Sequence, residues 1–261
     1  MTASTLRIAF LHLAPVPGDL AGNRRTIETA LHRAASHGAA WILTPELPVT
    51  GYTFAGTLGT AWIEPQPDAW LTHLYGLART LDVTLFLSHP DRDRKTGFLY
   101  NSLFVITPNQ LIAGSHRKIN ALRTGSESWS QRGESAIPIN VPPVGLVGLL
   151  ICADAYSATI ATSLKTQGAR LLVSSAAWAP GYHGPDGEWE RCTTETELPL
   201  LVCNRTGRDL TLDFTQAQSI VAGEGRRMLS MESEEEAIFL IEWDLATNTL
   251  ASRQADKINI S

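Results

Sequence analysis

A cysteine, Cys152, stands at the abrupt end of the apolar segment 144–151, a position from which a thiol can act as a nucleophile. This short, glycine-punctuated segment fits a strand buried on both faces, and residues 157–167 after it have helical spacing. A thiol attacks as its thiolate, and amide N–H groups or a nearby cation lower its pKa from about 8.5 toward neutrality. The strand-to-helix junction can supply both. The alternative is that Cys152 is a small, buried hydrophobic residue.

Glu46 and Lys118 occupy comparable positions. Glu46 follows the apolar segment 41–44 in a turn rich in Pro and Gly, and Lys118 lies in the basic cluster 115–120, after the apolar segment 102–106. In α/β sheets, ligands gather beyond the carboxyl ends of strands, so an acid, an amine and a thiol delivered there can converge. Taken singly, Glu46 is equally typical of a solvated turn, and Lys118 of an exposed basic face.

Five fragments in register carry a resemblance to a known family. They are P-E-x-x-x-x-G-Y at residues 45–52, R-K at 117–118, C-x-D at 152–154, S-S-A-A-W at 174–178 and the strand end with N-R-x-G at 201–207. In this order and spacing the chain resembles the nitrilase superfamily, the carbon–nitrogen hydrolases that use a Glu–Lys–Cys triad. The resemblance covers nearly the whole chain.

The resemblance implies an α/β fold: a four-layer α-β-β-α sandwich of the nitrilase type, in a single domain over residues 1–261. Composition agrees, because 261 residues with 44% hydrophobic content can bury a sizeable core and no linker or repeat divides them. Strand-like and helix-like segments also alternate, which favours an α/β protein. We predict strands at 6–11, 41–44, 84–88, 102–106, 145–151, 170–175, 200–204 and 237–243, and helices at 23–37, 68–81, 157–167 and 189–197.

The three groups match what hydrolysis of an amide requires: a nucleophile, a proton carrier and a stabiliser of the oxyanion. We predict that Cys152 forms a thioester and that Glu46 takes the thiol proton and delivers it to the departing amine, with a pKa raised by burial. Lys118 stabilises the oxyanion, assisted by the backbone N–H of Ala153 as the family implies. Glu127 resembles the superfamily's second glutamate, which would orient Lys118; an ordinary loop carboxylate is the alternative, and Glu134 competes for the alignment.

Aromatic residues near the motifs are candidates for the substrate pocket. Tyr52, Trp129 and Trp178 can wall the nonreactive part of a small substrate, although core packing explains Trp178 equally well. His183 lies in the turn-rich loop 180–187, which can close over the pocket or carry specificity. A lone loop histidine is more often solvated.

The sequence also departs from the family. Ala153 follows the nucleophile where many members carry an aromatic residue, so the pocket beside the thiol can differ in width. The R-A-x-E-N pattern of many members is reduced to one glutamate within 192–196, and the usual G-x-S is reduced to 217–219. These differences leave the triad intact. They weaken any inference of this protein's substrate from that of a known subfamily.

The predicted function is cofactor-independent hydrolysis of a small linear amide to a carboxylic acid and ammonia. Nitrile hydrolysis and N-carbamoyl hydrolysis are the nearest alternatives, since all three use the same triad. An acyltransferase, in which an amine or alcohol intercepts the thioester, and a noncatalytic binding scaffold of the same fold also remain open. No Gly-rich ATP-binding loop indicates an attached ligase.

Three cysteines without metal-binding spacing favour a reducing compartment, so we expect no bound metal and no disulfide framework. The N-terminal residues make neither a secretory signal nor a membrane span, and we expect a cytoplasmic protein. A net charge of −5 argues against a nucleic-acid surface. The expected partner is therefore a small-molecule substrate, not a nucleic acid or a membrane. The resemblance implies a homodimer or larger homo-oligomer.

Overall fold

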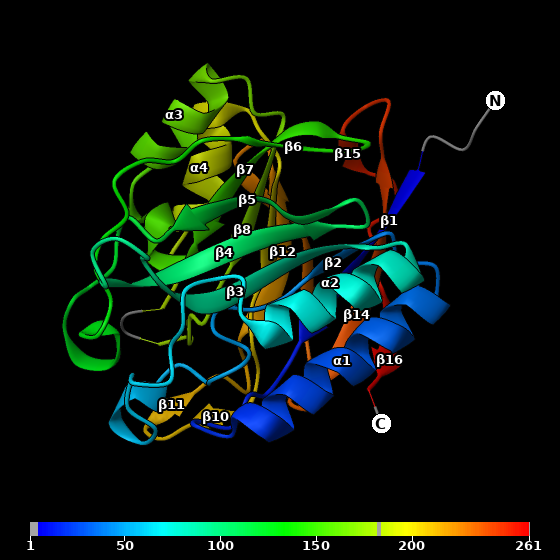
Figure 1. The fold of residues 1–261 in the computed structure, drawn as a ribbon. Helices are drawn as coiled ribbons and strands as arrows, with labels where there is room; N and C mark the ends of the chain where they lie inside the picture. Colours follow the sequence, from blue (N-terminus) through cyan, green and yellow to red (C-terminus); the bar gives the residue numbers. More distant parts are fainter. Residues whose placement is uncertain (1–4, 182–183, 261) are drawn as a thin grey trace.

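The computed structural model describes residues 5–181 and 184–260, which form two stacked β-sheets with helices on their outer faces (Figure 1). The strands are β1 (Thr5–His12), β2 (Trp41–Leu43), β3 (Thr84–Arg92), β4 (Leu99–Thr107), β5 (Gln110–Arg117), β6 (Ile139–Val141), β7 (Gly145–Ile151), β8 (Leu171–Ser175), β9 (Leu200–Cys203), β10 (Arg208–Asp209), β11 (Leu212–Asp213), β12 (Gln218–Gly223), β13 (Arg226–Glu232), β14 (Ala237–Asp244), β15 (Thr249–Leu250) and β16 (Asp256–Asn259). The helices are α1 (Leu20–Ser36), α2 (Ala69–Leu81), α3 (Thr159–Thr166) and α4 (Glu188–Thr196), with short 3-10 turns η1 (Phe54–Gly56), η2 (Gly125–Glu127) and η3 (Cys152–Tyr156).

Each sheet has a parallel centre and antiparallel edges. The first sheet has the order β15-β14-β1-β2-β3-β4-β5, with β16 also paired to β14, and the second has the order β13-β12-β9-β8-β7-β6. Strands β1, β2 and β3 are parallel in the first sheet, as are β7, β8 and β9 in the second. The loops that follow β2, β7, β8 and β9 therefore leave the carboxyl ends of parallel strands, where α/β proteins place their sites.

Alternation of side chains along β1 shows how the layers are built. Ile8 and Phe10 pack in the core that contains the facing residues of the second sheet, whereas Ala9 and Leu11 pack in the cluster with α1 and α2. Helices α3 and α4 contact the second sheet instead, at β7, β9, β12 and β13. The two helix pairs thus cover opposite outer faces, as Figure 1 shows, and complete the predicted α-β-β-α sandwich.

Every predicted strand and helix is present, and most have ends shifted from those predicted. Helix α1 begins earlier than predicted, at Leu20, because the Asp19 side chain caps it by accepting the N–H of Gly22 at 2.9 Å. Helix α3 begins later, at Thr159, because the residues after β7 form the 3-10 turn η3. In the part of the chain that the structure describes, none of the helices is long and apolar enough to cross a membrane.

Strand β5 was not predicted, and it corrects the placement of the basic cluster. Residues 115–117 belong to this strand, which pairs antiparallel with β4 across the turn at 108–109. Its side chains are mostly half-buried and mixed in polarity, so the strand lacks the apolar run that marks a buried one. Lys118 therefore follows the edge strand β5, and not the apolar strand β4 as expected from the sequence.

Candidate active site

Three strand ends bring the predicted triad to one place between the sheets. Glu46 follows β2 and Lys118 follows β5 in the first sheet, while Cys152 follows β7 in the second. The backbone N–H of Glu46 donates to the carbonyl of Ala176, just beyond β8, at 3.1 Å, which ties the two sheets together beside the site. The site is therefore built at the junction of the two layers.

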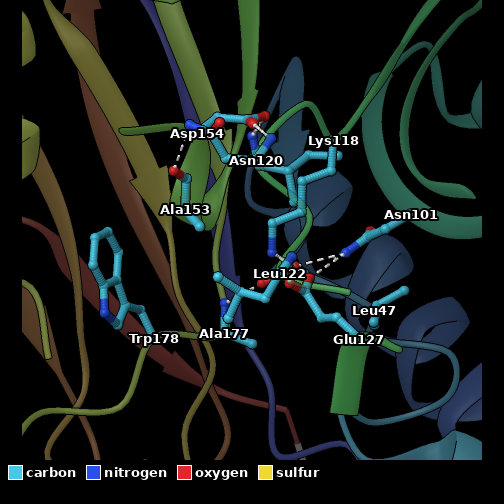
Figure 2. A network of polar contacts seen from close by, with 12 residues as sticks. Leu47, Asn101, Lys118, Asn120, Leu122, Glu127, Ala153, Asp154, Ala177 and Trp178 are labelled. Atoms are coloured by element: carbon cyan, nitrogen blue, oxygen red, sulfur yellow. Dashed lines mark hydrogen bonds and ion pairs between the residues drawn. The ribbon is translucent and has the colours of Figure 1, made fainter. Parts of the chain in front are cut away.

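Lys118 lies between two carboxylates. Its Nζ donates to Glu46 Oε1 at 2.8 Å and also forms an ion pair with Glu127 Oε1. Each of the three side chains is 1% exposed or less. In Figure 2 the side chains of Lys118 and Glu127 converge on the same point as that of Asn101. Charges removed from water in this way persist only when they are paired and hydrogen-bonded, as these are.

Neutral donors fix the orientation of both carboxylates. Asn101 Nδ2 donates to Glu46 Oε1 at 2.7 Å and to Glu127 Oε1 at 3.4 Å. The second oxygen of Glu46 accepts the N–H of Ala177 at 3.0 Å, and that of Glu127 accepts the N–H of Leu122 at 3.0 Å. Neither carboxylate can rotate away from Lys118 without losing a hydrogen bond in a buried site. Glu134 is exposed, so of the two candidate glutamates it is Glu127 that lies beside Lys118.

Cys152 has a strained backbone at the β7–η3 junction. Its φ is 45°, in the left-handed region that non-glycine residues rarely adopt, and its side chain is 5% exposed on the wall of a cavity. Backbone strain of this kind persists only where the surroundings impose it, and it gathers at functional sites. Here it marks the sharp turn that takes the chain from the strand into η3.

Asp154 imposes this turn and connects it to the lysine loop. One of its oxygens accepts the N–H groups of Ile119 at 3.0 Å and Asn120 at 2.8 Å, and the other accepts the N–H of Ile151 at 3.0 Å and Nε2–H of His116 at 2.8 Å. Asn120 Nδ2 in turn donates to the carbonyl of Ala153 at 3.1 Å, a contact visible in Figure 2. One buried carboxylate thus holds the segments on both sides of the nucleophile and of the lysine.

We expect Asp154→Asn to lower stability and turnover together. An amide in this position must turn a donor toward a site where Asp154 only accepts, leaving a buried donor unsatisfied at about 2 to 4 kcal/mol. Turnover should also fall by about 10- to 100-fold, because nucleophile and lysine lose their mutual positions. Urea unfolding and kcat on the same preparation measure both, with exposed Asp213→Asn as the matched control. Unchanged kcat in a destabilised Asp154→Asn protein would contradict the positioning role.

The electrostatics of the site favour a neutral thiol with a base beside it. Burial raises the pKa of the Cys152 thiol well above its usual range, Glu46 and Glu127 raise it further, and Lys118 opposes them. Burial likewise raises the pKa of Glu46, against the opposing charge of Lys118. For Lys118 itself burial acts downward, but Glu46 and Cys152 lift its pKa well above the ordinary value.

This result corrects the expectation that the junction lowers the thiol pKa. Burial of the Cys152 thiol raises its pKa most, and the negative charges of Glu46 and Glu127 raise it further against the one ammonium of Lys118. The thiolate must therefore form by proton transfer during attack instead of standing ready beforehand. Glu46, with its raised pKa, is suited to accept that proton.

A cavity of about 350 Å³ opens onto Cys152 and Lys118. Besides these two, its lining includes three further predicted residues, Ala153, Tyr52 and Trp178. Trp129 does not line it: the indole packs edge-on against Phe54 with ring centroids 5.1 Å apart, in a separate apolar cluster. Tyr52, which lines the cavity, packs against the same cluster, so Trp129 belongs to the apolar packing next to the wall. His183 lies outside the described residues.

Sequence reasoning missed several residues of the site. Asn101 donates to both carboxylates, and its position at the polar start of an apolar strand was the signal that could have found it. Tyr156 and Phe214 line the cavity from η3 and from the loop after β11. No local pattern points to Phe214, because the hairpin that delivers it is distant in sequence from the triad. Among the described residues, no group of three or more His, Cys, Asp or Glu side chains is arranged to hold a metal ion.

Two sheets stacked between helix layers, with a buried Glu–Lys–Cys set at their junction, define the nitrilase type of α/β protein. A family model for carbon-nitrogen hydrolases matches residues 7–252, and the chain belongs to that family. It is thus a carbon–nitrogen hydrolase of the nitrilase superfamily, as the sequence motifs predicted.

Proteins similar to this chain in sequence or in structure are named as nitrilases and amidases. A probable nitrilase of Schizosaccharomyces pombe is 26% identical over 246 residues, covering 91% of this chain and 88% of its own. A nitrilase of Pyrococcus abyssi is 27% identical over 244 residues, covering 92% and 90%. Among solved structures, Saccharomyces cerevisiae Nit3 superposes with a TM-score of 0.79 at 18% identity, covering 93% of this chain and 92% of that one. The crystal structure of an amidase from Nesterenkonia sp. gives 0.77 at 23% identity, covering 92% and 90%.

Proposed function

We propose that this protein is a cysteine-dependent amidase that hydrolyses a small linear amide to a carboxylic acid and ammonia through a thioester on Cys152. The observation that carries the proposal is the Lys118 ammonium held between Glu46 and Glu127, beside a thiol at the wall of a cavity. This set contains the nucleophile, the proton carrier and the oxyanion stabiliser that the reaction needs.

Acylation begins when Glu46 accepts the proton of the Cys152 thiol as Sγ attacks the amide carbonyl carbon. The carbonyl oxygen becomes an oxyanion, which the Lys118 ammonium and the Ala153 N–H stabilise. Glu46 then returns the proton to the amide nitrogen, the C–N bond breaks, and ammonia leaves. The product is a thioester between Sγ and the acyl group. Glu127 keeps Lys118 charged and in place throughout.

Deacylation repeats these roles with water as the nucleophile. Glu46 takes one proton from water while the oxygen attacks the thioester carbon, and Lys118 again stabilises the oxyanion. The C–S bond breaks, the proton returns to Sγ, and the carboxylic acid leaves. Glu46 and Lys118 thus act in both acylation and deacylation. Their fixed positions in the site suit this double use.

A nitrilase is the second candidate, and the names of the similar proteins from Schizosaccharomyces pombe and Pyrococcus abyssi favour it. A nitrile carbon would be attacked by the same thiol to give a thioimidate, which water converts to acid and ammonia. The triad serves either substrate. The rates of amide and nitrile hydrolysis must therefore be compared directly.

Matched substrates test the proposal. An amide, a nitrile and an N-carbamoyl amine with the same alkyl group are supplied separately, and released ammonia and organic product are quantified. We expect the amide to have the highest kcat/KM and to yield ammonia and acid in equal amounts. A nitrile hydrolysed faster than its matched amide would overturn the amidase assignment in favour of a nitrilase. Acyl transfer to an added amine in preference to water would assign an acyltransferase.

The activity is expected to decline on the acid side of its pH profile. Burial raises the pKa of Glu46, and below that pKa the carboxyl is protonated and cannot accept the thiol proton. The decline in kcat/KM should therefore begin at a pH above the ordinary glutamate pKa of about 4.3. Initial rates across a pH series, on enzyme shown to stay folded, measure it. A kcat/KM that stays level down to the ordinary glutamate value would contradict the role of Glu46.

A further inference from the structure

The cavity above the thiol is apolar apart from the triad. Its wall includes the large apolar side chains of Tyr52, Tyr156, Trp178, Leu212 and Phe214. Of the lining residues in the described part of the chain, only Lys118 carries a charge. A substrate group entering this space therefore meets aromatic and aliphatic surface.

Lys118 is the one cation among the described lining residues, and its charge is already balanced by two carboxylates. Lys118 is paired with Glu46 and Glu127, so the cluster carries one negative charge in excess when both carboxylates are ionised. When one of them is protonated, the cluster is neutral. In either state an anionic acyl group would lose its hydration without gaining a partner, and in the first state it would also be repelled.

A second cation, Arg205, lies behind the cavity wall, and its charge is paired with Asp209. Arg205 has no exposed surface, forms an ion pair with Asp209 and donates from Nη2 to the carbonyl of Pro15 at 3.0 Å. Its guanidinium stacks on the ring of Phe214, 4.6 Å from the centroid. Arg205 thus supports the aromatic wall, and its charge is neutralised by Asp209.

The wall is held in place before any substrate arrives. Asp209 accepts the backbone N–H of Tyr52 at 2.7 Å, which anchors the turn that carries this ring. The backbone N–H and carbonyl of Trp178 both bond to the Asn204 side chain at 3.0 Å. The Trp178 ring also makes an edge contact with Tyr156 at 5.1 Å between centroids. A preformed apolar wall of this kind binds without a large ordering cost.

Apolar surface continues to the mouth of the cavity. Leu122 and Tyr156 both line it, yet they are 48% and 47% exposed, among the few large hydrophobic side chains that reach solvent in the described chain. Exposed apolar groups rimming a pocket mark a surface that meets an apolar ligand.

We propose that the cavity selects amides with an uncharged, hydrophobic acyl group and rejects acyl groups that end in a carboxylate. This inference deepens the proposed function and rests on it for the identity of the reacting bond. It separates the candidate substrates by charge: N-carbamoyl amino acids and monoamides of dicarboxylic acids are disfavoured, whereas neutral alkyl and arylalkyl amides are favoured.

Two amides of equal chain length test the selection. Pentanamide ends in a methyl group, whereas glutaramate ends in a carboxylate. Propionamide serves as a small neutral reference. We expect kcat/KM for pentanamide to exceed that for glutaramate by about 100-fold or more, since an unpaired charge must be buried. Equal values, or a preference for glutaramate, would overturn the proposal.

Protection of the thiol separates this inference from the amidase assignment. Alkylation of Cys152 by iodoacetamide, followed by intact mass, requires no turnover of the amides. Pentanamide should slow alkylation at concentrations where glutaramate does not. Such protection without hydrolysis of any amide would sustain the apolar site and refute the amidase, whereas stronger protection by glutaramate would refute the apolar site.

A charge introduced at the mouth provides a second test. Tyr156 is half exposed, so Tyr156→Arg can place a guanidinium at the opening with little risk to the fold. We expect it to shift the ratio of kcat/KM toward glutaramate by about tenfold or more. Tyr156→Gln, which removes the ring without adding charge, is the matched control. The same shift in both variants would show that lost packing, and not charge, sets the preference.

Discussion

Replacing Cys152 with alanine is expected to reduce amide turnover to background, a loss on the order of 10⁴- to 10⁶-fold, because the acyl group then has no atom to bond to. The substitution removes only Sγ and keeps a side chain with the same backbone preference at φ 45°. Stability should therefore change little. Ammonia release and urea unfolding of the same preparation measure the two effects.

The other buried thiols provide controls for this result. Cys192 in α4 is fully buried, and burial raises its pKa to about 11 without any carboxylate–lysine cluster beside it. Cys192→Ala should keep the triad and its turnover. Persistent turnover in Cys152→Ala, or equal losses in both variants, would contradict the assignment of the nucleophile.

Glu46→Gln is expected to have two opposite effects. Turnover should fall by about 10²- to 10⁴-fold, because the amide cannot carry the proton between thiol, leaving group and water. Alkylation of Cys152 at a fixed pH should become faster, since the negative charge of Glu46 raises the thiol pKa and Lys118, which lowers it, remains. Loss of turnover together with faster alkylation of Cys152 distinguishes the loss of a base from general damage to the site.

Glu134→Gln is the matched control, because Glu134 is exposed and lies outside the lysine cluster. It should leave both turnover and alkylation unchanged. A Glu46→Gln protein with undiminished kcat, or with a thiol that reacts more slowly, would contradict the role of Glu46 as the base.

The layered fold and the triad were predictable because they rest on local patterns and on motif order. Buried strands such as β7 are continuous apolar runs, and the residues that follow them define the site. Strand β5 lacked such a run, so Lys118, which follows it, was recognised from the basic cluster and the R-K motif and not from the strand that carries it. Lys118 thus lies with Glu46 and Cys152 as predicted, although the strand that precedes it was not predicted.

Residues that depend on long-range packing were not predictable. Asn101 faces Glu46 and Glu127 only because β4 and β5 pair, and Phe214 reaches the cavity through a hairpin far along the chain. The predicted direction of the shift in the Cys152 thiol pKa was wrong for the same reason. Burial is the largest cause of the raised thiol pKa and the charges of Glu46 and Glu127 add to it, and the sequence reveals neither the burial of Cys152 nor its charged neighbours.

The central claim is that Cys152 carries the acyl group during turnover. Rapid acid quenching of the enzyme with pentanamide, followed by peptide mapping, tests it most directly. The account predicts the mass of a pentanoyl group on the peptide containing Cys152, formed and lost at rates that match ammonia release. Ammonia release at the full rate with Cys152 unmodified throughout, and retained in Cys152→Ala, would contradict it.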